Sequence, residues 1–321
     1  MKGLELARYY YETAGKQALE RQVPNLVPRL AIGLAGEGSE CFGFDDELSR
    51  DHDWGPAFCI WMTEEDFVKH GVQVQAVYRG LPDAVAGFSA RKSGIMSGGR
   101  VGCLCIEDWY RRYTGYAHGP ETLAQWRQIP ESFLATATNG EIFADPLGIF
   151  TGIREKLLVY YPEDIRIKKI VARAATMAQA GQYNYPRCVR RGDAVAAQLA
   201  LAKFANATNV YGQTKLEGEL AVATMSMVYL LNRRYAPYYK WIHRGMKNLE
   251  RLPRVAVQLE KLSRGEGEAQ EMIEGICLNV AAELRRQQLT TREDTFLIDL
   301  CADMMQRIQD PKLRQTHIMQ E

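Results

Sequence analysis

The chain has 321 residues, of which 46% are hydrophobic and 25% are charged, and this composition excludes disordered and collagen-like proteins. The 40 basic and 39 acidic residues leave a formal net charge of +1, so no global field favours nucleic acid or anionic lipid as a partner. The sequence has no apolar run of 18 residues and no signal-peptide pattern at its N-terminus. We therefore expect a cytoplasmic protein that does not bind a membrane.

The first half of the chain alternates between helix and strand patterns. Apolar residues at spacings of three and four predict an amphipathic helix over 3–21, which ends before Pro24. Residues 63–71 have helix signals, with Thr63 as the N-cap and Gly71 after the end. Short apolar runs predict buried strands at 29–36 and 56–62, a third strand at 100–106, and a short strand that runs into a turn at 141–148.

From about residue 150 the pattern becomes helical throughout. Strand-like alternation is missing, and most breaks fall at proline or glycine. The helical patterns cover 164–181, 190–208, 213–233, 237–250, 252–264, 266–287 and 291–309. The sequence therefore predicts an α/β region over 1–155 and an all-helical region over 156–321.

The seven cysteines predict reduced, buried thiols. Their number is odd, and most of them lie in apolar runs such as "FCIW" and "GICLNV". The closest pair, Cys103 and Cys105, has no second pair and no nearby histidine to complete the four ligands of a structural zinc site. This usage also favours a cytoplasmic protein.

The stretch "GEGS" (36–39) follows the first predicted strand, and two aspartates follow it about a dozen residues later. Small residues let backbone N–H groups approach an anion closely, and Ser39 adds a hydroxyl donor. Alternate residues of a strand project to one side, so Asp51 and Asp53, at or before the second strand, would converge on one point. Two carboxylates beside an anion cradle are what a Mg²⁺ (or Mn²⁺) and phosphate site requires.

Other binding motifs do not fit this stretch. Cys41 replaces the third glycine of a dinucleotide fingerprint, the G-K-[ST] of a P-loop is absent, and the acids lack EF-hand spacing. The five histidines show no ligand spacing, and His52 would point to the opposite strand face from the aspartates. The structural alternative is an acidic surface loop in which Asp51 caps a helix.

The turn and the D-x-D pair resemble the signature of the polymerase-beta-like nucleotidyltransferase superfamily. The wider string "GLELARYYYE … GLAGEGSECFGFDDELSRDHDWGP", with "GQYNYPRCVRRGD" and "LNRRYAPYYKW" further on, is similar to a bacterial family of unknown function attached to that superfamily. The resemblance implies an α+β fold, in which a nucleotidyltransferase-type mixed sheet with flanking helices precedes an all-α helical bundle. It also implies magnesium-dependent transfer of a nucleoside monophosphate from an NTP, with ATP as the expected donor, to an acceptor that the sequence does not identify.

The α/β region would supply the catalytic residues. Asp51 and Asp53 would hold the metals, and Gly38 with Ser39 would bind the outer phosphates. The superfamily normally adds a third carboxylate from a later strand, and the candidate here is Glu107 in "RVGCLCIED". Glu107 lies at the end of that strand, and the sequence leaves open whether its carboxylate reaches the metals.

The helical region would supply further nucleotide contacts. Arg187 and Arg191 are four residues apart and would share a helix face, beside Arg190, and guanidinium groups suit phosphate oxygens. Lys240 lies in the aromatic run 238–241, where rings would stack on a base. The structural alternatives are a solvated basic face for the arginines and a packed helix start for the aromatic run.

Three classes of function follow from these observations. The first is the nucleotidyltransferase. The second is a nucleotide-binding, sensing or interaction protein that kept the fold without turnover, which the lack of an obvious third acid favours. The third is a toxin–antitoxin component, with the tyrosine-rich stretch 229–239 as a modification target. The near-neutral charge does not favour a long nucleic-acid acceptor, and the oligomeric state stays open.

Overall fold

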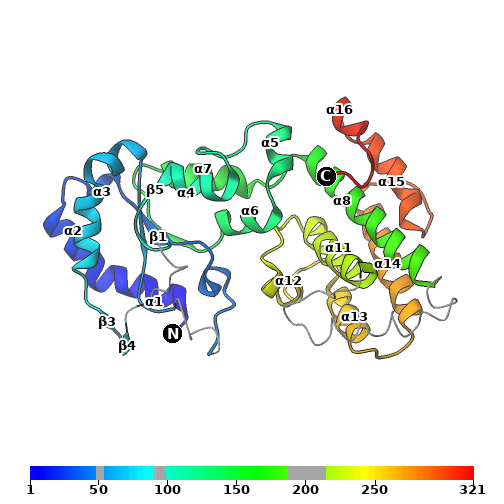
Figure 1. The fold of residues 1–321 in the computed structure, drawn as a ribbon, viewed down its shortest axis with the longest axis horizontal. Coiled ribbons are helices and arrows are strands. Elements are labelled where there is room, and N and C mark those ends of the chain that lie inside the picture. The colour runs from blue at the N-terminus through cyan, green and yellow to red at the C-terminus, as the bar shows by residue number, and fades with distance from the viewer. Residues whose placement is uncertain (48–53, 90, 92–98, 187–214) are drawn as a thin grey trace. The chain divides into compact units, whose positions relative to one another are not determined.

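The computed structural model describes residues 1–47, 54–89, 91, 99–186 and 215–321, which form two compact units (Figure 1). The first, here called the sheet unit, contains residues 1–122 and 129–159. The second, the helical unit, contains residues 123–128 and 160–321. Within the described ranges, no helix combines the length and the apolar composition that a membrane crossing needs. Five candidate residues lie outside the described residues, namely Asp51, Asp53, Arg187, Arg190 and Arg191.

The sheet unit is built on a four-stranded mixed sheet with the order β5-β2-β1-β6. Its strands are β1 (Ala31–Leu34), β2 (Cys59–Met62), β5 (Gly102–Cys105) and β6 (Glu141–Ala144). Strand β1 pairs antiparallel with both β2 and β6, whereas β2 pairs parallel with β5. A separate hairpin joins β3 (Ala84–Val85) to β4 (Phe88–Ser89). The mixed sheet with flanking helices is thus confirmed.

The helices of the sheet unit are α1 (Gly3–Tyr10), the π-helical η1 (Tyr11–Gly15), α2 (Lys16–Gln22), η2 (Val27–Arg29), η3 (Ser39–Phe42), α3 (Glu64–Arg79), α4 (Ile106–Thr114), α6 (Glu131–Thr138) and α7 (Ile149–Leu158). The helices predicted at 3–21 and 63–71 are present, and α4, α6, α7, η2 and η3 are further helices that the sequence patterns did not predict. Thr63 does cap α3, since its hydroxyl accepts from the N–H of Asp66 (3.3 Å). The helix nevertheless continues past Gly71, because Val74 and Val77 extend the buried face that packs on the sheet.

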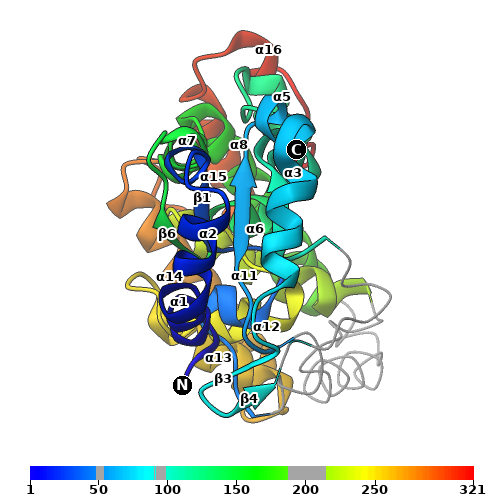
Figure 2. The same ribbon diagram turned by 90° about the vertical axis from the view of Figure 1, so that its left-hand side faces the viewer.

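Two layers of helices cover the sheet. The α1, α2 and α3 helices lie on one side, which faces the viewer in Figure 2, and α4, α6 and α7 lie on the other. Strand β2 is buried on both faces: Ile60 and Met62 join the core under α1–α3, while Trp61 points the other way. Its ring centroid lies 4.2 Å from that of Phe150 and 5.7 Å from that of Trp109.

The helical unit has no strand among its described residues, which confirms the helical prediction for residues 160–186 and 215–321. Its helices are α5 (Leu123–Gln128), α8 (Glu163–Met177), the π-helical η6 (Ala178–Asn184), α11 (Lys215–Leu231), α12 (Tyr239–Met246), α13 (Pro253–Ser263), α14 (Ala269–Arg286), α15 (Leu297–Gln306) and α16 (Pro311–Arg314). Helix α8 is the central element, because it packs against α5, α11 and α15. The helix predicted at 190–208 lies outside the described residues.

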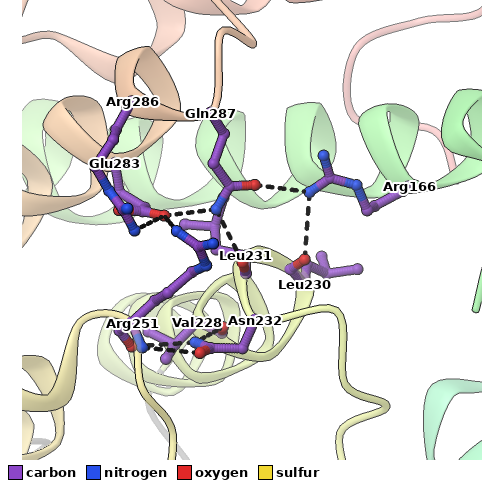
Figure 3. A network of polar contacts seen from close by, with 9 residues as sticks. All are labelled: Arg166, Val228, Leu230, Leu231, Asn232, Arg251, Glu283, Arg286 and Gln287. Atoms are coloured by element: carbon purple, nitrogen blue, oxygen red, sulfur yellow. Dashed lines mark hydrogen bonds and ion pairs between the residues drawn. The ribbon is translucent and has the colours of Figure 1, made fainter.

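Polar side chains close the C-terminal end of α11 (Figure 3). The last carbonyl groups of a helix have no partner within it, so other groups must supply the hydrogen bonds. Arg166 of α8, which is 2% exposed, donates to the carbonyl of Leu230 (3.4 Å) and to Oε1 of Gln287 (3.1 Å). Nε2 of Gln287 donates to the carbonyl of Leu231 (2.8 Å). This contact set joins α8, α11 and α14.

Glu283 extends the same network to two arginines. Its carboxylate accepts from Arg286 Nε (2.7 Å), from Gln287 Nε2 (2.6 Å) and from Arg251 Nη1 (3.1 Å). Burial acts to raise the pKa of Glu283, but the hydrogen bonds from Arg286 and Gln287 and the two positive charges outweigh it and hold the pKa below its usual range. The network is therefore a structural feature of the helical unit.

Candidate functional site

The "GEGS" turn lies at the edge of the sheet where β1 ends. Gly36 has a φ of +131°, a conformation that L side chains rarely adopt, so the position requires glycine. Its N–H donates to Oδ1 of Asn139 (2.9 Å), and Nδ2 of Asn139 donates back to its carbonyl (2.7 Å). Asn139 lies beside the turn because it directly precedes β6, in which Glu141 pairs with Leu34 at the end of β1. One amide side chain thus binds both backbone groups of Gly36.

Gly38 leaves room for a buried carboxylate. A Cβ atom at Gly38 would lie 2.4 Å from both carboxylate oxygens of Glu40, whose residue is 4% exposed. Oε1 of Glu40 forms an ion pair with Nη1 of Arg91 (3.1 Å), and the Arg91 side chain is only 9% exposed. Ser39 begins η3 beside this pair. The turn therefore packs directly against a buried ion pair.

The β3–β4 hairpin brings Arg91 to the turn. The ring of Phe88 contacts that of Trp54, with centroids 5.3 Å apart. A Cβ atom at Gly55, whose φ is +144°, would lie 3.0 Å from the backbone nitrogen of Arg91. Residues that directly follow Asp53 in the chain therefore contact the segment that carries Arg91.

The turn forms one wall of a recess. The recess is lined by Leu34, Ala35, Gly36, Glu37, Gly38, Glu40, Cys41, Arg91, Gly99, Arg100, Trp109 and Tyr113. Nη2 of Arg100 lies 2.9 Å from Oε2 of Glu37, and Arg112 lies 3.9 Å from the same carboxylate. The space left between these side chains is about 10 Å³, roughly what one water molecule needs. An anion that binds here must therefore take over contacts that Glu37 and Glu40 make.

The recess has a hydrogen-bond donor without an acceptor. Nε of Arg91 is buried and has no hydrogen-bond partner in the described part of the chain. A buried donor left in this state is costly, and a guanidinium suits the oxygens of a phosphate. The recess therefore contains one buried guanidinium N–H that an added hydrogen-bond acceptor could satisfy.

The thiols near the recess are not nucleophiles. Burial raises the pKa of Cys41 well above its usual value, and it raises that of Cys59 to about 12. Only a thiolate is an effective nucleophile or metal ligand, so both groups are inert at neutral pH.

Glu107 is not brought to the turn. Gly33 of β1 pairs with Cys59 of β2, and Cys59 pairs with Gly102 of β5, so the turn shares an edge with the starts of β2 and β5. Glu107 follows the end of β5 and lies at the opposite edge. There its Oε2 accepts from the N–H of Glu64 (2.8 Å) at the start of α3. In this structure Glu107 therefore caps a helix, and it does not join Gly38 and Ser39.

Lys240 belongs to the helical unit, where it is the second residue of α12 and is exposed. The rings of Tyr238 and Tyr239 contact each other just before it, with centroids 4.2 Å apart, and Trp241 lies 6.4 Å from Tyr238. The aromatic run thus begins a helix, and Lys240 lies in solvent.

A metal at the turn depends on Asp51 and Asp53. Among the described residues, no group of three or more His, Cys, Asp or Glu side chains converges as a metal site would require. The carboxylates near the turn already have partners, since Glu37 pairs with Arg100, Glu40 with Arg91, and Asp45 accepts from the N–H of Gly3 (2.9 Å).

Sequence patterns did not identify two arginines of the recess or the asparagine that holds its turn. Asn139, Arg91 and Arg100 lie in connections between elements, where no periodic pattern indicates a role. The available signals are weak: Asn139 precedes a glycine at a strand start, and the two arginines flank the glycine-containing stretch "KSGIMSGG".

Replacing Asn139 with alanine should lower the free energy of unfolding by about 2 kcal/mol, because two hydrogen bonds to a half-buried turn are lost together. Urea denaturation measures this. The control is Asn248→Ala, which changes an exposed amide in the helical unit. Equal stability of the two variants would show that Asn139 does not hold the turn.

Comparison with known proteins gives one match. Residues 126–212 and 201–242 match the model of a domain of unknown function, DUF4037. The matched region spans less than half of the chain and does not include the turn at 36–39. No curated protein and no solved structure matches the chain significantly. The match supports the resemblance to a family of unknown function and carries no activity with it.

Proposed function

We propose that the chain is a magnesium-dependent nucleotidyltransferase, which transfers a nucleoside monophosphate from an NTP to an acceptor hydroxyl or phosphate. One observation carries the proposal: the glycine turn after β1 shares its sheet edge with the start of β2, and D-x-D precedes that start in the chain. Asp53 is the sixth residue before Cys59, the first residue of β2. The distance along the chain is short enough for the aspartates to reach the turn.

The residues would have distinct roles. Asp51 and Asp53 would hold the metal through hard carboxylate oxygens. The bound ion would neutralise phosphate charge. Arg91 and Arg100 would contact the β- and γ-phosphates, in place of their ion pairs with Glu40 and Glu37, and the unpartnered Nε of Arg91 supports this role.

The transfer itself is a substitution at phosphorus. The acceptor oxygen forms a bond to the α-phosphorus, and the bond from this phosphorus to the oxygen that bridges it to the β-phosphate breaks. Pyrophosphate leaves with that electron pair, and the acceptor proton goes to water. Little covalent chemistry falls to the protein, so positioning and charge neutralisation would account for the rate.

A nucleotide-sensing or interaction protein with this fold is the second candidate. Two observations favour it: Glu107 caps α3 instead of joining the turn, and paired arginines and glutamates fill the recess. Binding without turnover would then be the function of the recess.

The test offers each of the four NTPs with Mg²⁺ or Mn²⁺ and a cell extract as the source of acceptors. We expect metal-dependent release of pyrophosphate with one NTP, and an acceptor heavier by one nucleoside monophosphate. The affinity for that NTP should fall about tenfold or more in Arg91→Met, because a phosphate contact of roughly 1.5–3 kcal/mol is lost. The control is Arg79→Met, which changes an exposed arginine of the same unit.

The outcomes separate the two candidates. NTP binding without pyrophosphate release supports the sensing protein. A wild-type chain that binds no NTP in the presence of either metal contradicts both. Because Arg91→Met leaves Glu40 buried without its partner, the double variant Arg91→Met/Glu40→Gln checks that lost affinity is not lost folding.

A further inference from the structure

Three cationic side chains of α8 hold the segment 317–321. Nζ of Lys168 donates to the carbonyl of His317 (2.6 Å). Nζ of Lys169 lies 3.4 Å from Oε2 of Glu321. Arg173, four residues after Lys169 and therefore on the same helix face, contacts both carboxylate oxygens of Glu321, with Nη2 3.2 Å from Oε2.

Groups outside this segment hold two of these cations in place. Nε of Arg173 donates to Oγ of Ser226 on α11 (2.8 Å), and Nζ of Lys169 lies 5.3 Å from the ring centroid of Tyr161. The residue Lys169 is only 5% exposed, and buried lysines are rare unless they are paired. The positions of both cations therefore do not depend on Glu321 alone.

The segment that supplies the carboxylate is held much more loosely. It follows α16 and contains turns instead of a helix, with Gln320 N–H donating to the carbonyl of His317 (2.9 Å). The residues His317, Met319, Gln320 and Glu321 are exposed, and polar contacts with cationic side chains of α8 attach both ends of the segment. A contact at an exposed carboxylate exchanges more easily than the partly buried contacts with Ser226 and Tyr161 that position the two cations.

We propose that Lys169 and Arg173 form a binding site for a phosphoryl group, which Glu321 occupies in this structure as a tethered carboxylate. A phosphoryl group has three terminal oxygens and up to two negative charges. It can therefore accept hydrogen bonds from the guanidinium of Arg173 and the ammonium of Lys169 together better than a carboxylate can. A dissolved ligand must compete with Glu321 at an effective concentration in the millimolar range. The site lies within the helical unit and does not rest on the proposed nucleotide transfer.

Glu321→Gln tests this, since it keeps the side-chain shape and removes the charge. The matched control is Glu293→Gln, which removes an exposed carboxylate of the same unit. Full-length variants are titrated with inorganic phosphate at constant ionic strength, by calorimetry and by thermal shift. We expect Glu321→Gln to bind phosphate about tenfold more tightly than the wild type and Glu293→Gln, and the gain to disappear in Glu321→Gln/Arg173→Met.

Three outcomes would overturn the inference. Equal phosphate affinity of the two Gln variants shows that Glu321 does not compete for the site. A gain that persists in the double variant places the phosphate elsewhere. A gain with ATP but not with inorganic phosphate assigns the effect to nucleotide binding. If Arg173→Met does not fold, as judged by circular dichroism, Lys169→Met in the same background takes its place.

Discussion

Replacing Asp53 with asparagine should reduce magnesium-dependent NTP turnover by at least two orders of magnitude, which corresponds to about 3 kcal/mol of transition-state stabilisation. The substitution keeps the shape of the side chain and removes the charge that a divalent cation needs. Thermal stability without metal should stay equal or rise, because two like charges close together disfavour the folded state.

The control for this variant is Asp83→Asn, which removes an exposed carboxylate of the sheet unit. Pyrophosphate release and thermal melts, each with and without Mg²⁺ and NTP, are measured for both variants and the wild type. A wild type whose melting temperature does not respond to ligand, beside an Asp53→Asn protein that unfolds earlier, would identify the aspartates as structural caps. The proposed mechanism would then be wrong.

Replacing Arg166 with methionine should lower the free energy of unfolding by about 3 kcal/mol. The new side chain is of similar length, but it leaves the carbonyl of Leu230 and Oε1 of Gln287 without this donor inside the helical unit. It also removes two hydrogen bonds to Glu163, at 2.7 and 3.0 Å. Guanidinium denaturation measures the loss.

The same variant should change the response to acid. Burial acts to raise the pKa of Glu163, but the hydrogen bonds and the charge of Arg166, with those of Arg233, outweigh it and lower the pKa. A lowered pKa stabilises the folded state above the ordinary carboxyl pKa of about 4.3, and this contribution is lost as the pH falls below that value. Arg166→Met should therefore lose less stability than the wild type between about pH 5 and pH 3.

The matched control is Arg254→Met, an exposed arginine of the same unit. It should retain both the stability and the acid response of the wild type. If Arg166→Met is as stable as this control, the contacts of Arg166 at the end of α11 make no measurable contribution to the free energy of unfolding.

Local patterns were sufficient to predict most elements of the fold. The run "FCIW" predicts a strand with both faces covered, and β2 is such a strand, between two helical layers. The end of α3 was predicted too early, because Gly71 resembles a helix stop while Val74 and Val77 continue the buried face. The burial of Lys168 and Lys169 was not predictable either, since helix periodicity does not show that neighbours surround α8 on several sides.

The candidate site was less predictable because it depends on pairing between strands. The sequence identifies the "GEGS" turn, but it does not show that β5 runs parallel to β2, which takes Glu107 to the other edge. It also does not show that a hairpin brings Arg91, or that the β6 pairing brings Asn139, to the turn. These are long-range contacts, and no local propensity encodes them.

The short helix α5 makes both units discontinuous in the sequence. The chain leaves the sheet unit after Thr122, adds Leu123–Gln128 to the helical unit, and returns at Ile129 to complete the sheet. Trp126 of α5 packs against Tyr161, with ring centroids 5.8 Å apart, so a residue that precedes the last part of the sheet unit contacts one that follows it. Neither unit can therefore be separated from the other by dividing the chain at one position. A fragment that starts at residue 160 would lack α5, which is part of the core of the helical unit.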